Sequence, residues 1–209
     1  YLKRIVHQED ANRFIREHAN DNAFEFCRGV IEEVGITFDV KGLDNVPKTG
    51  GCILACKHPM GALEAMCMVA ALQEIRTDLK FIVNDLLLSL ENLKEIFVGV
   101  NKHGRVTLDS LKTVNELFSS HQLILVFPSG LVSRKRRGVI EDLGWKKTFI
   151  SQSKKYNKPV VPVFINGRNS NYFYRLSSVR TFLGIKANIE MIYLVDEMYR
   201  QKEKTIKII

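Results

Sequence analysis

The chain has 209 residues and a formal net charge of +8, a length at which one domain can bury a full hydrophobic core. No apolar run approaches the roughly eighteen residues that a membrane-spanning helix needs. The positive charge is concentrated, because residues 130–180 contain twelve Lys and Arg against two acidic residues. Such a segment could bind an anionic head group or other phosphates, an acidic protein, an anionic membrane surface or nucleic acid, although most single lysines are typical of a solvated face.

The four cysteines show neither the C-x-x-C spacing of redox motifs nor a histidine at zinc-ligand spacing, so we expect buried, reduced thiols and no metal site: Cys27, Cys52, Cys56 and Cys67. The chain begins at Tyr1 without a Met and stops at Ile209 in what resembles the start of a strand. We therefore expect a fragment of a longer protein. We expect it to form one domain, with an N-terminal helical segment at 1–35 packed on an α/β region at 36–209.

Apolar residues at three-to-four spacing predict helices through residues 8–34, with a break near Asn20. Their apolar face could pack on the domain or lie on a membrane. The polar face has mixed charge and lacks the Lys and Arg enrichment of an interfacial anchor, which favours packing. A strand is expected at 36–40, followed by a loop around Pro47 and a buried strand at 52–56.

His58 lies in the turn between this buried strand and a predicted helix over 62–75, a stretch rich in Ala, Leu and Met without Gly or Pro. Residues six apart lie roughly 240° around an ideal helix, so His58 and Glu64 could not meet if the whole segment were helical. Pro59 and Gly61 permit a turn that brings the carboxylate back to the imidazole. The alternative is an exposed loop histidine beside a first-turn Glu that favours the helix dipole.

A second strand-to-turn junction lies at 122–127, where a buried strand runs into Pro128-Ser129-Gly130 and then into four basic residues at 134–137. The other expected elements are strands and helices in alternation: strands at 79–83, 97–100, 159–165 and 188–195, and helices at 85–90, from Thr107 onward, and at 143–156. This alternation predicts an α/β layered fold with a largely parallel or mixed central sheet flanked by helices.

Together the two junctions resemble the glycerolipid and lysophospholipid acyltransferases, which carry a His-and-acid motif and, further along, a Phe-Pro-x-Gly turn followed by Ser-Arg. The stretch from His58 to Glu64, His-Pro-Met-Gly-Ala-Leu-Glu, is most similar to a bacterial branch that includes ornithine- and glycine-lipid O-acyltransferases and hemolysin-like proteins. The resemblance covers residues 46–173. The chain has Glu64 where Asp is usual, Lys57 where Asn is usual, and Ser129 where the better-known branch has Glu.

The resemblance implies transfer of a fatty acyl group from an acyl-carrier protein or acyl-coenzyme A thioester to the hydroxyl of a lysolipid, in membrane lipid biosynthesis and without a further cofactor. It implies that His58 is the general base, that Glu64 orients and stabilises it, and that the acceptor attacks directly without an acyl-enzyme. Arg134 is the preferred head-group ligand, because a guanidinium pairs bidentately with oxyanions. The full set of substrate-binding candidates is basic or turn residues: Lys102, Arg105, Ser129, Gly130, Arg134 and Lys135. The resemblance also implies a peripheral position on the inner face of the cytoplasmic membrane, against its anionic surface.

Three alternatives stay open. The acceptor could be a lyso-amino-acid lipid or lysophosphatidate, the latter making the chain a 1-acylglycerol-3-phosphate acyltransferase, and the extra residue in the histidine motif favours the former by resemblance. A non-catalytic lipid- or membrane-binding module of the same fold would bind lipid or carrier without turnover. A nucleic-acid binder would show steep salt dependence centred on residues 130–180, but it gives no reason for the His58 turn, so we expect no nucleic-acid partner.

Overall fold

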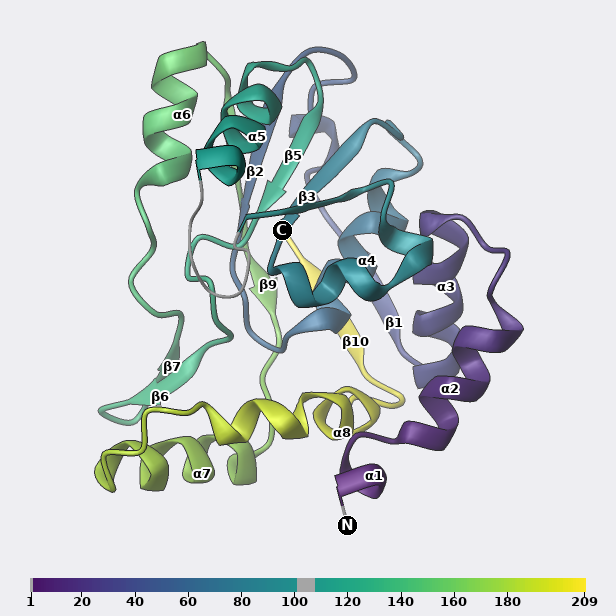
Figure 1. The fold of residues 1–209 in the computed structure, drawn as a ribbon, viewed down its shortest axis with the longest axis vertical. Coiled ribbons are helices and arrows are strands. Elements are labelled where there is room, and N and C mark those ends of the chain that lie inside the picture. Colours follow the sequence, from purple (N-terminus) through teal and green to yellow (C-terminus); the bar gives the residue numbers. More distant parts are fainter. Residues whose placement is uncertain (1, 101–107) are drawn as a thin grey trace.

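The central sheet of the computed structural model has five strands. The structure describes residues 2–100 and 108–209 (Figure 1). The order of the strands across the central sheet is β4 (Phe97–Gly99), β3 (Leu79–Val83), β5 (Leu123–Val126), β2 (Cys52–Cys56) and β8 (Val160–Val163). Each neighbouring pair in this sheet is parallel. Every residue of β2 and β5 is buried, as expected for central strands that are covered on both faces. The predicted α/β architecture with a parallel central sheet is confirmed.

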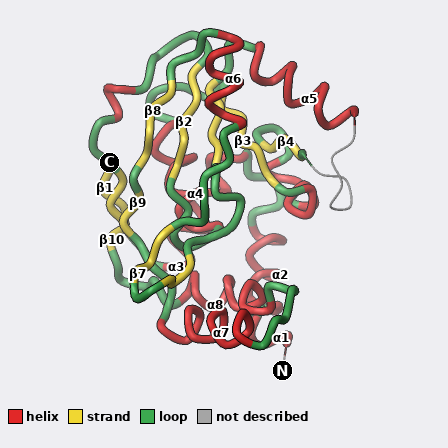
Figure 2. The backbone as a smooth tube through the Cα atoms, turned by 90° about the vertical axis from the view of Figure 1, so that its left-hand side faces the viewer, coloured by secondary structure: helices red, strands yellow, loops and turns green. Residues whose placement is uncertain are grey.

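Helices cover both faces of this sheet (Figures 1 and 2). Leu54 of β2 belongs to a buried layer that includes helices α3 and α4, whereas its neighbour Ile53 packs in a second layer with α5 and α6. The first layer also contains Phe14 of α2 and Phe26 of α3, so the apolar face of these helices packs on the core. The helix bounds are α1 (Leu2–Ile5), α2 (Gln8–Glu17), α3 (Ala23–Val34), α4 (Ala62–Leu72), α5 (Leu108–Ser119), α6 (Thr148–Tyr156), α7 (Asn171–Phe182) and α8 (Leu194–Tyr199), with 3-10 helices at Leu43–Asn45, Asp85–Ser89, Glu91–Leu93 and Ile189–Tyr193.

Two smaller sheets lie beside the central one: β1 (Thr37–Val40), β10 (Thr205–Ile208) and β9 (Ile165–Asn166) form the first, and β6 (Arg134–Arg136) and β7 (Val139–Glu141) form the second. The second is a hairpin with a two-residue turn, Arg137–Gly138, in which both φ angles are positive, at 47° and 85°. This hairpin follows the Phe-Pro-Ser-Gly turn and lies beside α7 (Figure 1). The second predicted junction therefore leads directly into an exposed basic hairpin.

The strand predicted at 188–195 is wrong, because a 3-10 helix at Ile189–Tyr193 runs directly into α8. Two buried carboxylates explain the helical path. Glu190 lies between two arginines, and Glu197 accepts hydrogen bonds from the backbone N–H and hydroxyl of Ser170. Residues seven apart share a face of a helix but point to opposite faces of a strand, so burying both carboxylates requires the helix.

Two other predicted elements differ from the structure for similar reasons. Helix α6 begins five residues later than predicted, because the segment before it is held as a loop in which the Trp145 indole N–H donates to Asp142. The strand predicted at 159–165 is interrupted at Phe164, whose backbone N–H and carbonyl both pair with Ile209. The interruption moves the chain from the central sheet into the three-stranded one.

Candidate active site

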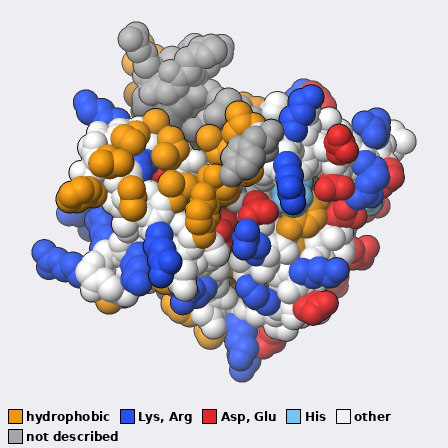
Figure 3. All heavy atoms as spheres, turned by 90° about the horizontal axis from the view of Figure 1, so that it is seen from below, with side chains coloured by type: hydrophobic (Ala, Val, Ile, Leu, Met, Phe, Trp, Pro, Cys, Tyr) orange, Lys and Arg blue, Asp and Glu red, His pale blue; other side chains and the backbone are white. Residues whose placement is uncertain are grey.

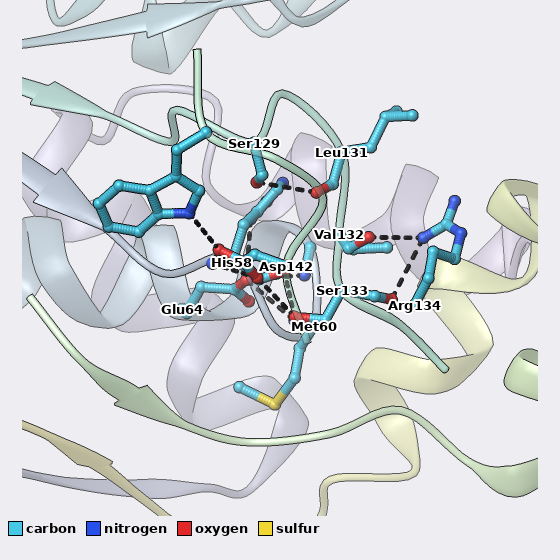
Figure 4. A network of polar contacts seen from close by, with 11 residues as sticks. His58, Met60, Glu64, Ser129, Leu131, Val132, Ser133, Arg134 and Asp142 are labelled. Carbon is cyan, nitrogen blue, oxygen red and sulfur yellow. Dashed lines mark hydrogen bonds and ion pairs between the residues drawn. The ribbon is translucent and has the colours of Figure 1, made fainter. Parts of the chain in front are cut away.

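The turn after β2 brings His58 and Glu64 together, with His58 Nδ1 2.9 Å from Glu64 Oε1 (Figure 4). Gly61 makes this turn possible. Its φ of 123° and ψ of −118° form a backbone conformation that residues with a side chain rarely adopt. A Cβ at Gly61 would also lie 3.3 Å from Leu194 Cδ1 of α8. The glycine thus lets the chain fold back on itself and lets α8 approach the turn.

Glu64 is fully buried, and its Oε1 is surrounded by donors. Besides His58, the backbone N–H groups of Met60 and Gly61 donate to it at 3.0 and 2.9 Å. These N–H groups at the start of α4 compensate the burial of a negative charge. Because an ionised carboxylate can only accept, His58 Nδ1 must donate the proton, which leaves the lone pair of the neutral imidazole on Nε2. The pair is therefore arranged as a general base and the acid that orients it.

The imidazole of His58 is also held by an aromatic ring. Phe127, directly after β5, stacks on it with ring centroids 4.1 Å apart and an interplanar angle of 17°. Phe81 of β3 supports Phe127 from an edge-on position at 5.3 Å. The His58 side chain keeps 16% of its surface exposed. The ring is thus fixed in position, while part of it can still be reached by a substrate.

Asp142 clamps the backbone of the histidine turn from the other junction (Figure 4). Its carboxylate accepts the His58 backbone N–H at 3.1 Å, the Ser133 hydroxyl at 2.6 Å and the Trp145 indole N–H at 3.0 Å. The Ser133 backbone N–H in turn donates to the His58 carbonyl at 2.7 Å. Both polar groups of the His58 backbone are therefore bound to the segment after β5. Sequence reasoning missed Asp142, which lies 84 residues from His58 and has no motif around it.

The Phe-Pro-Ser-Gly turn lies next to this network. The Ser129 side chain is buried and donates to the Leu131 carbonyl at 2.9 Å, which is the arrangement of a turn residue and not of an activated nucleophile. Gly130 has φ 69°, and its N–H donates to the Phe127 carbonyl at 3.0 Å. That N–H is therefore occupied within the turn.

Arg134, expected to bind the acceptor head group, is directed into the protein in this structure. Its guanidinium donates to the Val132 carbonyl at 2.7 Å and to Glu190 Oε1 at 2.9 Å, and 7% of its side chain is exposed. Burial lowers the pKa of this guanidinium, and Arg180 lies on the other oxygen of Glu190 at 2.8 Å. Because its donors are used internally, the geometry gives Arg134 a structural role in joining β6 to the 3-10 helix at Ile189–Tyr193. Glu190, the buried carboxylate that pairs with Arg134, lies 56 residues later in the chain.

Of the other candidates, Lys135 is exposed at the start of the hairpin, whereas Lys102 and Arg105 lie outside the described residues. In the described part of the chain, no three or more His, Cys, Asp and Glu side chains are grouped so as to hold a metal ion. The same part contains no helix that is both long and apolar enough to cross a bilayer.

Comparison with known proteins agrees with this geometry. A family model described as Acyltransferase matches residues 1–209. The chain belongs to this acyltransferase family. The relatives of the enzyme include two proteins named Lyso-glycine lipid O-acyltransferase. The one from Bacteroides thetaiotaomicron is 40% identical over 209 residues, covering 100% of this chain and 77% of that protein. The one from Phocaeicola vulgatus is 38% identical over 206 residues, covering 98% and 74%.

A solved structure, the 1-acyl-sn-glycerophosphate (LPA) acyltransferase PlsC from Thermotoga maritima, is similar at 17% sequence identity. The match covers 79% of this chain and 73% of that chain, with a TM-score of 0.49. A likeness at this level says nothing about the acceptor of the enzyme. The family prediction made from the two junctions is confirmed by the family match and by the curated relatives.

Proposed function

We propose that the enzyme transfers a fatty acyl group from a thioester to the hydroxyl of a lyso-glycine lipid, with His58 as the general base. The observation that carries the proposal is the buried contact between His58 Nδ1 and Glu64 Oε1, which leaves Nε2 as the basic nitrogen. The names of the two relatives that cover the chain support the acceptor class. The acyl donor is an acyl-carrier protein or acyl-coenzyme A.

In this mechanism His58 Nε2 takes the proton of the acceptor hydroxyl as its oxygen attacks the thioester carbonyl carbon. The carbon–sulfur bond then breaks, and the thiolate leaves with the proton returned by the imidazolium. Glu64 stabilises the transient positive charge on the ring, and its position is maintained by the backbone N–H groups of Met60 and Gly61. Glu64 reaches Nδ1 from the first turn of α4, which supports its acting in place of the usual Asp.

Substrate binding is assigned to residues of the turn after β5 and of the β6–β7 hairpin. Ser129 and Gly130 lie in the turn that follows Phe127, the ring that stacks on the imidazole. Lys135 is exposed and lies two residues after Ser133, whose backbone N–H donates to the His58 carbonyl. Lys102 and Arg105 stay candidates for the acceptor head group. Arg134 acts by positioning the loop, since its guanidinium is bound to Glu190. The enzyme works at the anionic inner face of the cytoplasmic membrane, where lipid acceptors reside.

The decisive experiment measures release of free thiol from acyl-carrier protein or acyl-coenzyme A thioesters by the wild type and by His58→Ala. Lyso-glycine lipid, lyso-ornithine lipid and lysophosphatidate serve as parallel acceptors. We expect release that depends on lyso-glycine lipid and is lost in His58→Ala, with an unchanged circular dichroism spectrum. Release with lysophosphatidate alone would reassign the enzyme to glycerophospholipid synthesis. Near-normal turnover by folded His58→Ala would refute the mechanism.

A further inference from the structure

Large apolar side chains are exposed at the carboxyl end of α7. Phe182 is 90% exposed, Leu183 62% and Val179 54%, and Ile185 follows at 40%. Gly184, with φ 69°, turns the chain so that the Ile185 N–H bonds back to the Arg180 carbonyl, which keeps these side chains in one short stretch. Seen from below, hydrophobic side chains gather on the left of the molecule, where α7 lies (Figure 3). We call Val179, Phe182, Leu183 and Ile185 the apolar patch. A contiguous patch of this kind marks an interaction site.

The surroundings of the apolar patch are basic. Residues 168–189, which include α7 and the patch, contain four Lys and Arg and no acidic residue. The next acidic residue, Glu190, is fully buried against two arginines and contributes no exposed negative charge. In Figure 3 most Asp and Glu side chains lie on the right half of the view, away from the patch. The charged side chains that α7 and the loop after it expose are therefore all basic.

A cavity of about 520 Å³ adjoins the patch, between the β6–β7 hairpin and α7. Lys135, Arg137 and Arg175 line it, and Val179 belongs both to its wall and to the apolar patch. The described residues that line the cavity include no carboxylate. Arg137 reaches this position from the tight hairpin turn, where it adopts φ 47°. The cavity is suited to an anionic group held beside an apolar surface.

We propose that the apolar patch and this basic cavity form the surface through which the enzyme docks on an anionic bilayer. Phe182 and Leu183 enter the lipid interface, and Arg137 and Arg175 bind anionic lipid head groups. The proposal rests on the proposed function in one respect, that the acceptor is a membrane lipid. A second copy of the chain fits this surface poorly, because an isologous contact would set the basic surfaces of two protomers against each other.

The docking surface is connected to the active site through buried contacts. Ser133, which donates to the His58 carbonyl, is followed directly by Arg134, the first residue of the hairpin. Glu190 links Arg134 to Arg180 of α7, one turn before Leu183. The hairpin and α7 are thus held in a defined position relative to the histidine turn. A docked enzyme presents its site to the membrane in one orientation.

The test is co-sedimentation with vesicles of phosphatidylglycerol and phosphatidylcholine, and with vesicles of phosphatidylcholine alone, in the absence of acyl donor. We expect the wild type to bind the anionic vesicles and to lose binding as salt is raised. The double variant Phe182→Ser/Leu183→Ser should weaken vesicle binding about tenfold or more. The double variant Arg137→Asn/Arg175→Gln should weaken binding to the anionic vesicles about tenfold or more, and should leave binding to phosphatidylcholine vesicles unchanged. Ile150→Ser and Lys154→Gln, on α6 at the far end of the molecule, are the matched controls and should bind as the wild type (Figure 1).

The outcomes separate this proposal from the proposed function. Retained vesicle binding by both double variants overturns the docking surface, whatever the enzyme transfers. A wild type that binds vesicles through these residues yet releases no thiol with any acceptor supports the docking surface and refutes the reaction. If sedimentation velocity shows that the apolar double variant converts a dimer into a monomer, the patch is a contact between copies and the proposal is wrong.

Discussion

Replacing Glu64 by Gln removes one charge from the dyad and keeps its shape. The amide oxygen can still accept from His58 Nδ1 and from the N–H groups of Met60 and Gly61, so the imidazole keeps its tautomer. What is lost is the attraction between the carboxylate and the imidazolium that forms in the transition state. For unit charges about 4 Å apart at an effective dielectric constant of 20, this attraction is about 4 kcal/mol. Since each 1.4 kcal/mol is tenfold in rate, kcat should fall roughly a thousandfold.

The assay is thiol release at saturating lyso-glycine lipid, so that the change appears in kcat and not in KM. Glu64→Asp is the matched control, because it keeps the charge and restores the acid usual in the resembled branch; we expect it to stay within about tenfold of the wild type. The Gln side chain places its NH₂ group near the position of Oε2, which is buried without a partner among the described residues. Because a buried donor without an acceptor lowers the free energy of unfolding, the melting temperature of both variants should be measured. A Gln variant that turns over at the wild-type rate would show that the carboxylate is structural and would refute the electrostatic role of Glu64.

Three further predictions concern the clamp, the pH dependence and the thiols. Asp142→Ala should lower kcat at least tenfold with little change in acceptor KM, because the His58 backbone N–H loses its partner; an unchanged kcat in kinetic assays would contradict the clamp. The Arg76 guanidinium, which is hydrogen-bonded to Asp78, lowers the pKa of that carboxyl in the folded protein. The ionised Asp78 therefore stabilises the fold at any pH above its unfolded-state pKa of about 4. This stabilisation is lost as the pH falls through the lower pKa of the folded state. Because the Asp78 side chain is 45% exposed, Asp78→Asn should cost at most about 1 kcal/mol at pH 7, and the difference from the wild type in urea titrations should shrink below pH 4. Burial raises the pKa of Cys27 to about 12 and raises the pKa of Cys56 and Cys67 further, so iodoacetamide at pH 8 should label none of them in native protein and all of them in denaturant, as read by mass spectrometry.

The parts of the site that could be predicted from the sequence are those set by local backbone chemistry. An apolar run followed by Pro59 and Gly61 indicates a strand that ends in an unusual turn, and that turn is what brings Glu64 to His58. The alternation of Leu54 and its neighbours between two buried layers likewise follows from an uninterrupted apolar strand. In each case the determining residues lie within a few positions of one another.

The parts that could not be predicted depend on which distant polar groups meet. Arg134 has the sequence context of a ligand-binding residue, and its inward direction is decided by Glu190. Glu190 also explains why 188–195 is helical, although the residues there have the alternation of a strand. Asp142 accepts a hydrogen bond from the His58 backbone N–H although the two residues lie 84 positions apart, and no motif around either residue predicts the contact. Such pairings are properties of tertiary packing.

The buried group of Arg134, Glu190 and Arg180 has a consequence for how this chain can change over time. Loss of Glu190 alone would leave two guanidinium groups facing each other in a water-poor interior, a defect of the kind that costs about 3–5 kcal/mol. Replacing all three by well-packed apolar residues could instead be neutral. Loss of both arginines would likewise leave the fully buried Glu190 carboxylate without a positive partner, so either order of substitution passes through an unstable ancestor. The three positions should drift together or not at all.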